Sequence, residues 1–233
     1  MLGPQFTFRV AVFMGHRAMA ALNRAYHAWL EASKYYNSVK NDHPSKYTHH
    51  LGQFTIYRKE EFANCVDAII LYQSMMETII NYAYREHSEI LGTMPKNQSF
   101  ANKWRIALKK IVDEKDPILT TFDQYDKQFY KALRNPLVHP DAGVNQGTGK
   151  PTIAIKDTEP FRFAIVYRGM FAGWQCFEKL FDGIEMTHDE DSWATFCNTY
   201  GLPSSIDQSE FIPISDMLIP LEQRFQDLFN SPD

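Results

Sequence analysis

Cysteine and long hydrophobic runs are scarce in this sequence of 233 residues. The three cysteines form no C-x-x-C pair, so neither a disulfide framework nor a zinc site is expected, and a reducing cytoplasmic setting fits. The longest apolar run, near residues 68–72, is far shorter than the roughly 20 residues of a membrane span, and no signal-peptide pattern is present. The sequence therefore predicts a cytoplasmic protein with no membrane partner.

Charge is distributed unevenly along the chain, although hydrophobic residues (44%) and aromatic residues (14%) are abundant enough for a folded core. Residues 1–184 hold 23 Lys and Arg against 18 Asp and Glu, a sum of +5. Residues 185–233 hold one basic residue against ten acidic residues, a sum of −9, and the two sums give the net charge of −4. We therefore predict a helical domain over residues 1–185 and an acidic C-terminal appendage over residues 186–233 packed on it.

The role of the acidic appendage is open. It could be a solvated acidic surface, or a cover over the mildly basic body. A third reading is that it docks as extra core, which its aromatic residues favour: Trp193, Phe196, Phe211 and Phe225.

Hydrophobic periodicity predicts an all-α chain. Apolar residues recur at helical spacing between 14 and 38, and the segment 59–87 is apolar nearly all round, as in a central buried helix. Further helices are expected over 98–114, 117–134, 161–181, 189–200 and 215–229. Residues 41–58 carry Pro and Gly and predict a loop. A strand at 54–57 would end this loop and pair with 152–156 as a short two-stranded β element.

Two local signals refine this outline. Asp116 followed by Pro117 predicts a helix that begins with an N-cap and with proline in its first position. Gly169 and Gly173, four residues apart, predict that the last long helix packs closely against a neighbour.

Metal and cysteine chemistry find little support. His43, His49 and His50 cluster in the predicted loop, but no carboxylate or cysteine at ligand spacing accompanies them. No His/Asn frame surrounds any cysteine, so a thiol nucleophile is not predicted. We expect no metal and no cofactor.

Polar residues interrupt the otherwise apolar segment 59–87. Glu77 and Asn81 are four residues apart and therefore share one helix face. A buried carboxylate is costly unless it is paired. The sequence therefore predicts either a cation that reaches Glu77 or a site lined by this face.

Positive charge gathers between residues 96 and 134, where nine basic residues face five acidic ones. This segment could be an ordinary solvated helix pair, or a surface that faces phosphates. The second interpretation makes four residues candidates for RNA backbone contacts: Lys103, Arg105, Lys127 and Lys131.

The most informative segment, "LRNPLVHP" at 133–140, follows directly. Arg134, Asn135 and His139 lie within six residues of one another. A proline after Asn135 and another after His139 disfavour the helical conformation of both residues. We therefore expect this polar group to cluster at the end of a core helix, where Arg134 can meet Glu77.

The segment "RNPLVH" resembles the R-x4-6-H motif of the HEPN superfamily, a group of small all-helical proteins that includes RNase toxins and abortive-infection factors. "YQSMMETIINYA" is similar to a second feature of that group, a buried helix that carries an acidic residue and then an Asn. The resemblance covers roughly residues 10–185 in helix order. It implies an antiparallel helical bundle, a homodimer whose two motifs combine, and metal-independent cleavage of RNA. An inhibitor or antitoxin protein would be a further partner.

The resemblance gives each motif residue a role. His139 would exchange protons with the ribose 2′-OH and the leaving 5′-oxygen. Arg134 would stabilise the charge that develops on the phosphate, Asn135 would orient the phosphate or the imidazole, and Glu77 with Asn81 would hold the site. An alternative stays open, in which the motif has a purely structural role and the chain is a non-catalytic HEPN-like module that binds protein or RNA. Pro136 is a restriction that the motif does not require.

Overall fold

The chain folds into an all-α structure, seen here in a computed structural model that describes residues 4–41, 46–134, 137, 160–186 and 192–206. No strand occurs among these residues. In chain order the elements are α1 (Pro4–Asn41), α2 (Tyr47–Glu86), α3 (Ser88–Leu91), α4 (Phe100–Ile111), α5 (Pro117–Gln124), the π-helix η2 (Tyr125–Arg134), α7 (Phe163–Gly183) and α8 (Trp193–Thr199). Within the described ranges no helix is both long and apolar enough to cross a membrane.

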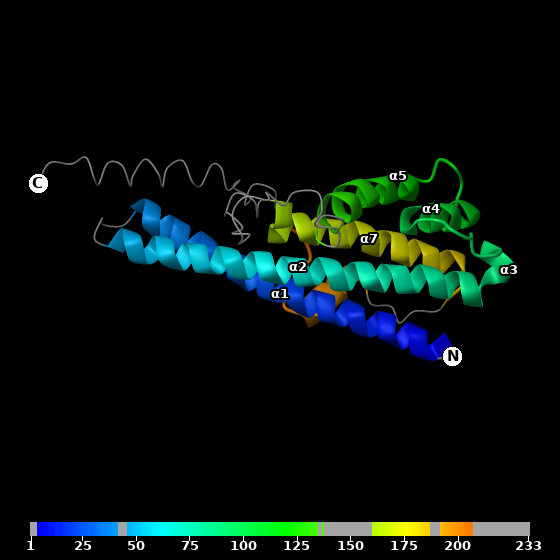
Figure 1. The fold of residues 1–233 in the computed structure, drawn as a ribbon, viewed down its shortest axis with the longest axis horizontal. Helices are drawn as coiled ribbons and strands as arrows, with labels where there is room; N and C mark the ends of the chain where they lie inside the picture. Colours follow the sequence, from blue (N-terminus) through cyan, green and yellow to red (C-terminus); the bar gives the residue numbers. More distant parts are fainter. Residues whose placement is uncertain (1–3, 42–45, 135–136, 138–159, 187–191, 207–233) are drawn as a thin grey trace, which may run out of the picture.

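Helices α1 and α2 form a long antiparallel hairpin that runs the length of the molecule (Figure 1). With 38 and 40 residues, each is roughly 60 Å long. On each helix one set of buried residues recurs in alternating steps of four and three, which is the heptad pattern of a coiled coil. On α1 these are Ala11, Gly15, Ala18, Leu22, Ala25, Trp29, Ala32 and Tyr36; on α2 they are Phe54, Arg58, Glu61, Cys65, Ala68, Tyr72, Met75 and Ile79.

Small side chains on α1 let the two helices approach closely. A Cβ added at Gly15 would lie 2.7 Å from Met75 Sδ, too near for the packing to remain as it is. Most other seam positions of α1 are alanine and are fully buried. The helical spacing predicted over 14–38 is confirmed, and the helix extends well beyond it.

The first turns of α2 correct the prediction for residues 41–58. The helix begins at Tyr47, so the predicted loop over 46–58 and the strand at 54–57 are wrong. Phe54 is fully buried in a small cluster with Ala32 and Tyr36 of α1, and this contact outweighs the β propensity of its neighbours. The proposed partner strand at 152–156 lies outside the described residues.

Helix α7 packs along α2 and against η2, and its two interior glycines make this possible. A Cβ at Gly169 would collide with the Phe129 ring, and one at Gly173 would lie 2.8 Å from Tyr72 and 2.9 Å from Tyr125. The prediction of close packing at both positions is confirmed. Tyr72 also donates a hydrogen bond to the carbonyl oxygen of Met170 at 2.7 Å.

Helix α4 packs on α2 and α7 near α3, and α5 packs on α4 and α7; each begins at a side-chain cap (Figure 1). The side chain of Ser99 accepts a hydrogen bond from the N–H of Asn102, and that of Asp116 accepts one from the N–H of Ile118. The cap at Asp116 and the proline in the first turn are as predicted. Trp104 anchors α4 to α2 by donating to the carbonyl oxygen of Met76 at 3.3 Å.

The part of the C-terminal appendage that the structure describes docks on α1 and α7. Trp193 is buried, and its indole N–H donates to Tyr167 of α7 at 2.9 Å. Phe196 stacks on Trp174 with ring centroids 5.0 Å apart, and Asn23 of α1 donates to the carbonyl oxygen of Tyr200. The segment 193–206 therefore contributes to the main core, whereas Phe211, Phe225 and the helix predicted over 215–229 lie outside the described residues.

Candidate functional site

Glu77 and Asn81 lie one turn apart on α2, on the part of the helix that contacts α4 and η2. Glu77 is half-buried and Asn81 is exposed. The amide oxygen of Asn81 accepts a hydrogen bond from Lys103 Nζ at 2.9 Å. This face therefore lies at the edge of the core, and Glu77 is less desolvated than the sequence suggested.

The helix that leads into the motif is not α-helical throughout. Helix α5 continues directly into η2, whose ten residues have π-helical geometry and end at Arg134. In a π-helix the hydrogen bonds join residues five apart, and such turns occur frequently at functional sites. The same repeat brings Lys131 Nζ to 2.7 Å from the carboxylate of Asp126. The predicted helix over 117–134 is confirmed in extent, but its change of geometry has no signal in the sequence.

Arg134 lies at the end of η2 beside an aromatic ring. Its guanidinium carbon is 5.4 Å from the centroid of the Tyr130 ring, within the range of a cation–π contact. Burial raises the pKa of the Tyr130 phenol, while the charge of Arg134 lowers this pKa and that of Glu77 raises it. Both charges therefore act on the same phenol, which places Arg134 and Glu77 in one neighbourhood. A direct ion pair between them stays a prediction.

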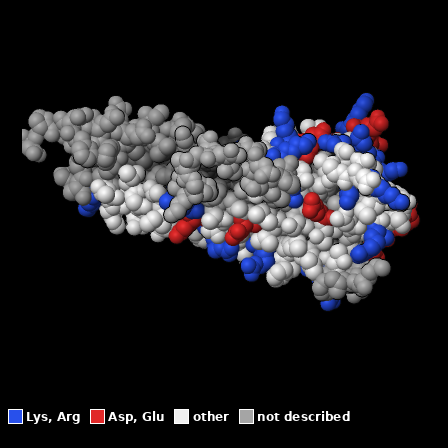
Figure 2. Space-filling view, in the orientation of Figure 1, with Lys and Arg blue, Asp and Glu red and all other residues white. Residues whose placement is uncertain are grey.

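The four candidate RNA contacts differ in how they are held. Arg105 donates two hydrogen bonds to Asp123, at 2.7 and 3.1 Å, and lies 3.7 Å from Asp126. Lys131 pairs with Asp126 and Lys103 with Asn81. Lys127 is exposed and pairs with none of the described residues. Figure 2 shows the result as Lys and Arg side chains with Asp and Glu among them, at the end of the molecule that carries α4 and α5.

The rest of the motif falls on residues that the structure does not describe. Asn135 and His139 lie outside the described residues, so their predicted roles stay predictions. Leu137, between them, is half-buried and packs against the main hydrophobic core. The chain is therefore anchored to the body three residues after Arg134.

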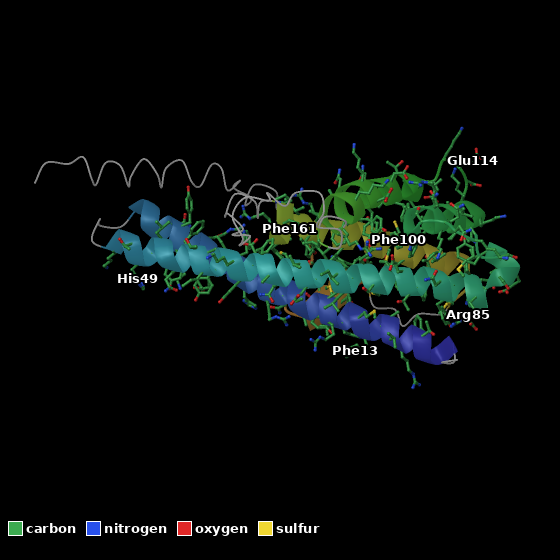
Figure 3. The ribbon with its side chains drawn as sticks, in the orientation of Figure 1. Phe13, His49, Arg85, Phe100, Glu114 and Phe161 are labelled. Carbon is green, nitrogen blue, oxygen red and sulfur yellow. The ribbon has the colours of Figure 1, made fainter. Side chains whose placement is uncertain are left out.

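A buried charged cluster between α2 and α7 was missed by the sequence reasoning. Arg58, Glu61 and Arg162 are each at most 1% exposed. Arg58 pairs with Glu61, and Arg162 Nε lies 3.6 Å from Glu61 Oε1. The same oxygen accepts the N–H of Phe163 at 2.8 Å, so Glu61 caps the first turn of α7. Phe161, labelled in Figure 3, marks this end of α7.

This cluster has a signal in the sequence, although the signal is easily misread. Arg58 and Glu61 occupy two successive seam positions of the heptad pattern on α2. When only hydrophobicity is considered, a charged pair at such positions is interpreted as part of a solvent-exposed helix face, because charged residues are rarely buried unless they are paired. Continuing the heptad upstream from Cys65 to Phe54 would have placed both residues in the core.

Neither a thiol nucleophile nor a metal site is found among the described residues. All three cysteines are free and buried, and burial raises the pKa of Cys65 and of Cys176 to about 12. These thiols stay protonated at neutral pH and lack the thiolate that a nucleophile requires. Across the described ranges no group of three or more His, Cys, Asp or Glu could hold a metal ion.

Comparisons with protein-family models, with curated proteins and with solved structures find no match for this chain. Any function must therefore be argued from the residues of the chain itself.

Proposed function

We propose that this chain is a HEPN-like, metal-independent endoribonuclease of the toxin or phage-defence type, acting in the cytoplasm as a homodimer. The placement of Arg134 is the observation that carries the proposal. Arg134 ends a π-helix, lies over Tyr130 in the electrostatic neighbourhood of Glu77, and is followed in the chain by Asn135 and His139. An Arg held in this way presents a fixed, permanently charged donor group to a phosphate.

The chemistry divides between two residues. His139 takes the proton of the ribose 2′-OH, the 2′-oxygen attacks the adjacent phosphorus, and the 5′-oxygen leaves with a proton from a histidine. Arg134 neutralises the charge that builds on the phosphate oxygens in the transition state. The homodimer would bring two Arg134 and His139 sets together, so that one imidazole can act as base and the other as acid. Asn135 orients the phosphate or the imidazole.

The RNA backbone would follow the basic face of α4 and η2. Lys127 is exposed and can contact a phosphate directly. Arg105 would exchange part of its contact with Asp123 for phosphate oxygens, since this exposed pair is weak. Lys131 is 60% exposed and could contact a phosphate while it stays beside the buried carboxylate of Asp126. An inhibitor protein that masks this face would be the expected antitoxin.

Incubation of purified protein with a mixed RNA pool in EDTA tests the proposed activity. We expect wild type to cleave and His139→Ala to be slower by roughly 100- to 10,000-fold, because the general acid and base is lost. His49→Ala is the matched control, since His49 is exposed near the start of α2. Identical RNA fragments from wild type and His139→Ala would rule out the proposed catalysis for that pool.

A second candidate function is a non-catalytic HEPN-like module that binds RNA or a partner protein. It is favoured by the engagement of Arg105 and Lys131 with acidic residues and of Arg134 with Tyr130, which are structural contacts. In such a module the motif would hold the fold together and His139 would be dispensable.

Stability of an Arg134→Ala variant separates the two candidates. Because Glu77 is only half-buried, the catalytic reading expects a loss of about 1 kcal/mol, or a melting temperature lower by about 2–4 °C, together with loss of cleavage. Arg85→Ala, at an exposed position of α2, is the control for removing an arginine. A much larger fall in melting temperature with an unchanged RNA pattern would favour the non-catalytic module.

A further inference from the structure

A cavity of about 350 Å³ lies between α7 and the helix formed by α5 and η2. Tyr125 and Phe129 form its floor, each only 1% exposed and stacked with ring centroids 5.3 Å apart. Gly169 of α7 also lines the cavity, and its missing side chain lets Phe129 pack directly against α7. The floor is therefore rigid and apolar, and the size is at the lower end of small-ligand sites.

The rim of this cavity is polar, and two of its side chains have no hydrogen-bond partner among the described residues. Gln124 and Gln128, four residues apart, are exposed, and neither carboxamide hydrogen-bonds to a described residue. Arg168 faces them from α7, and its Nε donates to the carbonyl oxygen of Ala164 at 3.2 Å. Among the residues that the structure describes, no carboxylate pairs with Arg168. Arg105 and Lys131 differ, because acidic residues hold both of them.

We propose that this cavity binds a single unpaired nucleotide of an RNA chain. A carboxamide offers a donor and an acceptor together, which is what the edge of a nucleobase requires, and a guanidinium offers donors to the adjoining phosphate. None of the described lining residues is acidic, so none of them repels a phosphate. The inference rests on the proposed function, and it assigns to this cavity the recognition of a base in the RNA substrate.

The position of the cavity links recognition to cleavage. Phe129 of the floor and Arg134 are five residues apart, which is the hydrogen-bonding repeat of η2. They therefore lie one helical turn apart, on the order of 5 Å along the axis. A nucleotide held between Gln128 and Arg168 would bring a neighbouring phosphodiester toward Arg134, so the bound base would select the cleaved bond.

Calorimetric titration of the full chain tests binding without any need for catalysis. The probes are the four nucleoside 5′-monophosphates, the matching nucleosides and inorganic phosphate. We expect at least one monophosphate to bind more tightly than its nucleoside and than phosphate. Arg168→Ala should weaken that binding at least tenfold, and Gln128→Ala about threefold to tenfold. Gln175→Ala, on an exposed position of α7 outside the cavity, is the control and should change binding less than twofold.

Mapping of cleavage sites separates this inference from the proposed activity. If wild type cleaves RNA, Gln128→Ala should cleave with a relaxed base preference, and Gln175→Ala should keep the wild-type preference. Unchanged preference in both Gln128→Ala and Arg168→Ala would overturn the nucleotide site and leave the ribonuclease standing. If nothing is cleaved but a monophosphate binds and requires Arg168, the site stands and the ribonuclease fails. Absence of monophosphate binding, or equal binding of inorganic phosphate, overturns the nucleotide site.

A variant that fills the cavity tests the site even if the Arg168→Ala and Gln128→Ala proteins misfold. Ala172 also lines this cavity, and its side chain is half-buried. Ala172→Met should block monophosphate binding and leave the melting temperature near that of wild type, since the added volume enters empty space. Retained binding in a folded Ala172→Met protein would contradict the assignment of the cavity.

Discussion

Two charged clusters of similar composition differ in how far they are buried. Arg58, Glu61 and Arg162 are buried between α2 and α7, each at most 1% exposed. In the other cluster, the surface cluster between α4 and the helix formed by α5 and η2, Arg105 is 34%, Asp123 60% and Lys131 60% exposed, and only Asp126 is buried. Both combine guanidinium and carboxylate groups, so residue type alone does not distinguish them.

The difference shows that burial, not charge, determines what such a cluster does. In water a surface pair is screened and contributes little. A buried carboxylate between two arginines, in contrast, cannot lose one partner without leaving an uncompensated charge. Glu61 also accepts the backbone N–H of Phe163, so the buried cluster sets the position of α7 along α2. The surface cluster sets no such register.

Replacement of the buried carboxylate should have the largest effect. Glu61→Ala leaves two buried arginines without their shared partner, and we expect a loss of about 3–5 kcal/mol in the free energy of unfolding. For a chain of this length that corresponds to a fall in melting temperature on the order of 10 °C. Urea unfolding followed by circular dichroism measures it. Asp123→Ala is the matched surface control, and equal losses in the two variants would remove the distinction between the clusters.

Truncation of the surface arginine should have a much smaller effect. Arg105→Ala removes two hydrogen bonds to Asp123, one to Asn102, an ion pair with Asp126 at 3.7 Å and a cation–π contact with Phe122 at 5.8 Å. We expect a loss of at most about 1 kcal/mol at low salt, shrinking further in 1 M NaCl because exposed charges are screened. Chemical unfolding at the two salt concentrations checks this, with Lys109→Ala on the same helix as the control. A large loss in the free energy of unfolding that is the same at both salt concentrations would show that the surface cluster behaves like the buried one.

The smallest effect concerns the cap of α5 and depends on pH. The N–H of Ile118 holds the pKa of Asp116 below its ordinary value, against partial burial and with help from Lys179. A carboxyl whose pKa is lowered by folding stabilises the protein above its unfolded-state pKa, about 3.9, and this contribution is lost as the pH falls through the folded-state value. The difference in stability between wild type and Asp116→Ala should therefore be present at pH 7 and fade in strong acid. Asp116→Asn, which keeps a capping oxygen without a titrating group, should lose little and show no such fading.

Local signals explain which helices the sequence could predict. Asp116 and the proline after it define the start of α5, because a cap and a fixed φ act within a few residues. The glycines at 169 and 173 predicted close packing for the same reason, since only a missing side chain admits an aromatic ring there. The predicted helix over 98–114 contains α4, which ends at Ile111.

Long-range contacts explain where the prediction was wrong. Residues 46–58 carry a glycine and β-branched side chains, and by themselves they favour a loop and a strand. In the folded chain Phe54 is buried against α1, and this packing outweighs the local preference. Arg58 and Glu61 concealed the continuation of the heptad, because their burial depends on Arg162, about a hundred residues away.

The features of the candidate site also divide into those that the sequence predicts and those that only the structure shows. Arg134, Glu77 and the basic candidates were all found from residue type and spacing. The sequence did not show that Arg134 lies over Tyr130 at the end of a π-helix. Nor did it show a cavity whose two glutamines have no hydrogen-bond partner among the described residues. A π-helix and a cavity both arise from how α7 fits against η2, and no local pattern encodes that fit.

By itself the sequence determined the all-α class, the helix that ends in the motif, the capped start of α5 and the close packing at two glycines. These follow from periodicity and from contacts within a few residues. Only the tertiary structure decided which charges are buried, where α2 begins and which polar groups near Arg134 are free to meet a ligand. The reason is physical: the cost of a charge or of an unpaired amide depends on its surroundings, and those are assembled from segments distant in the chain.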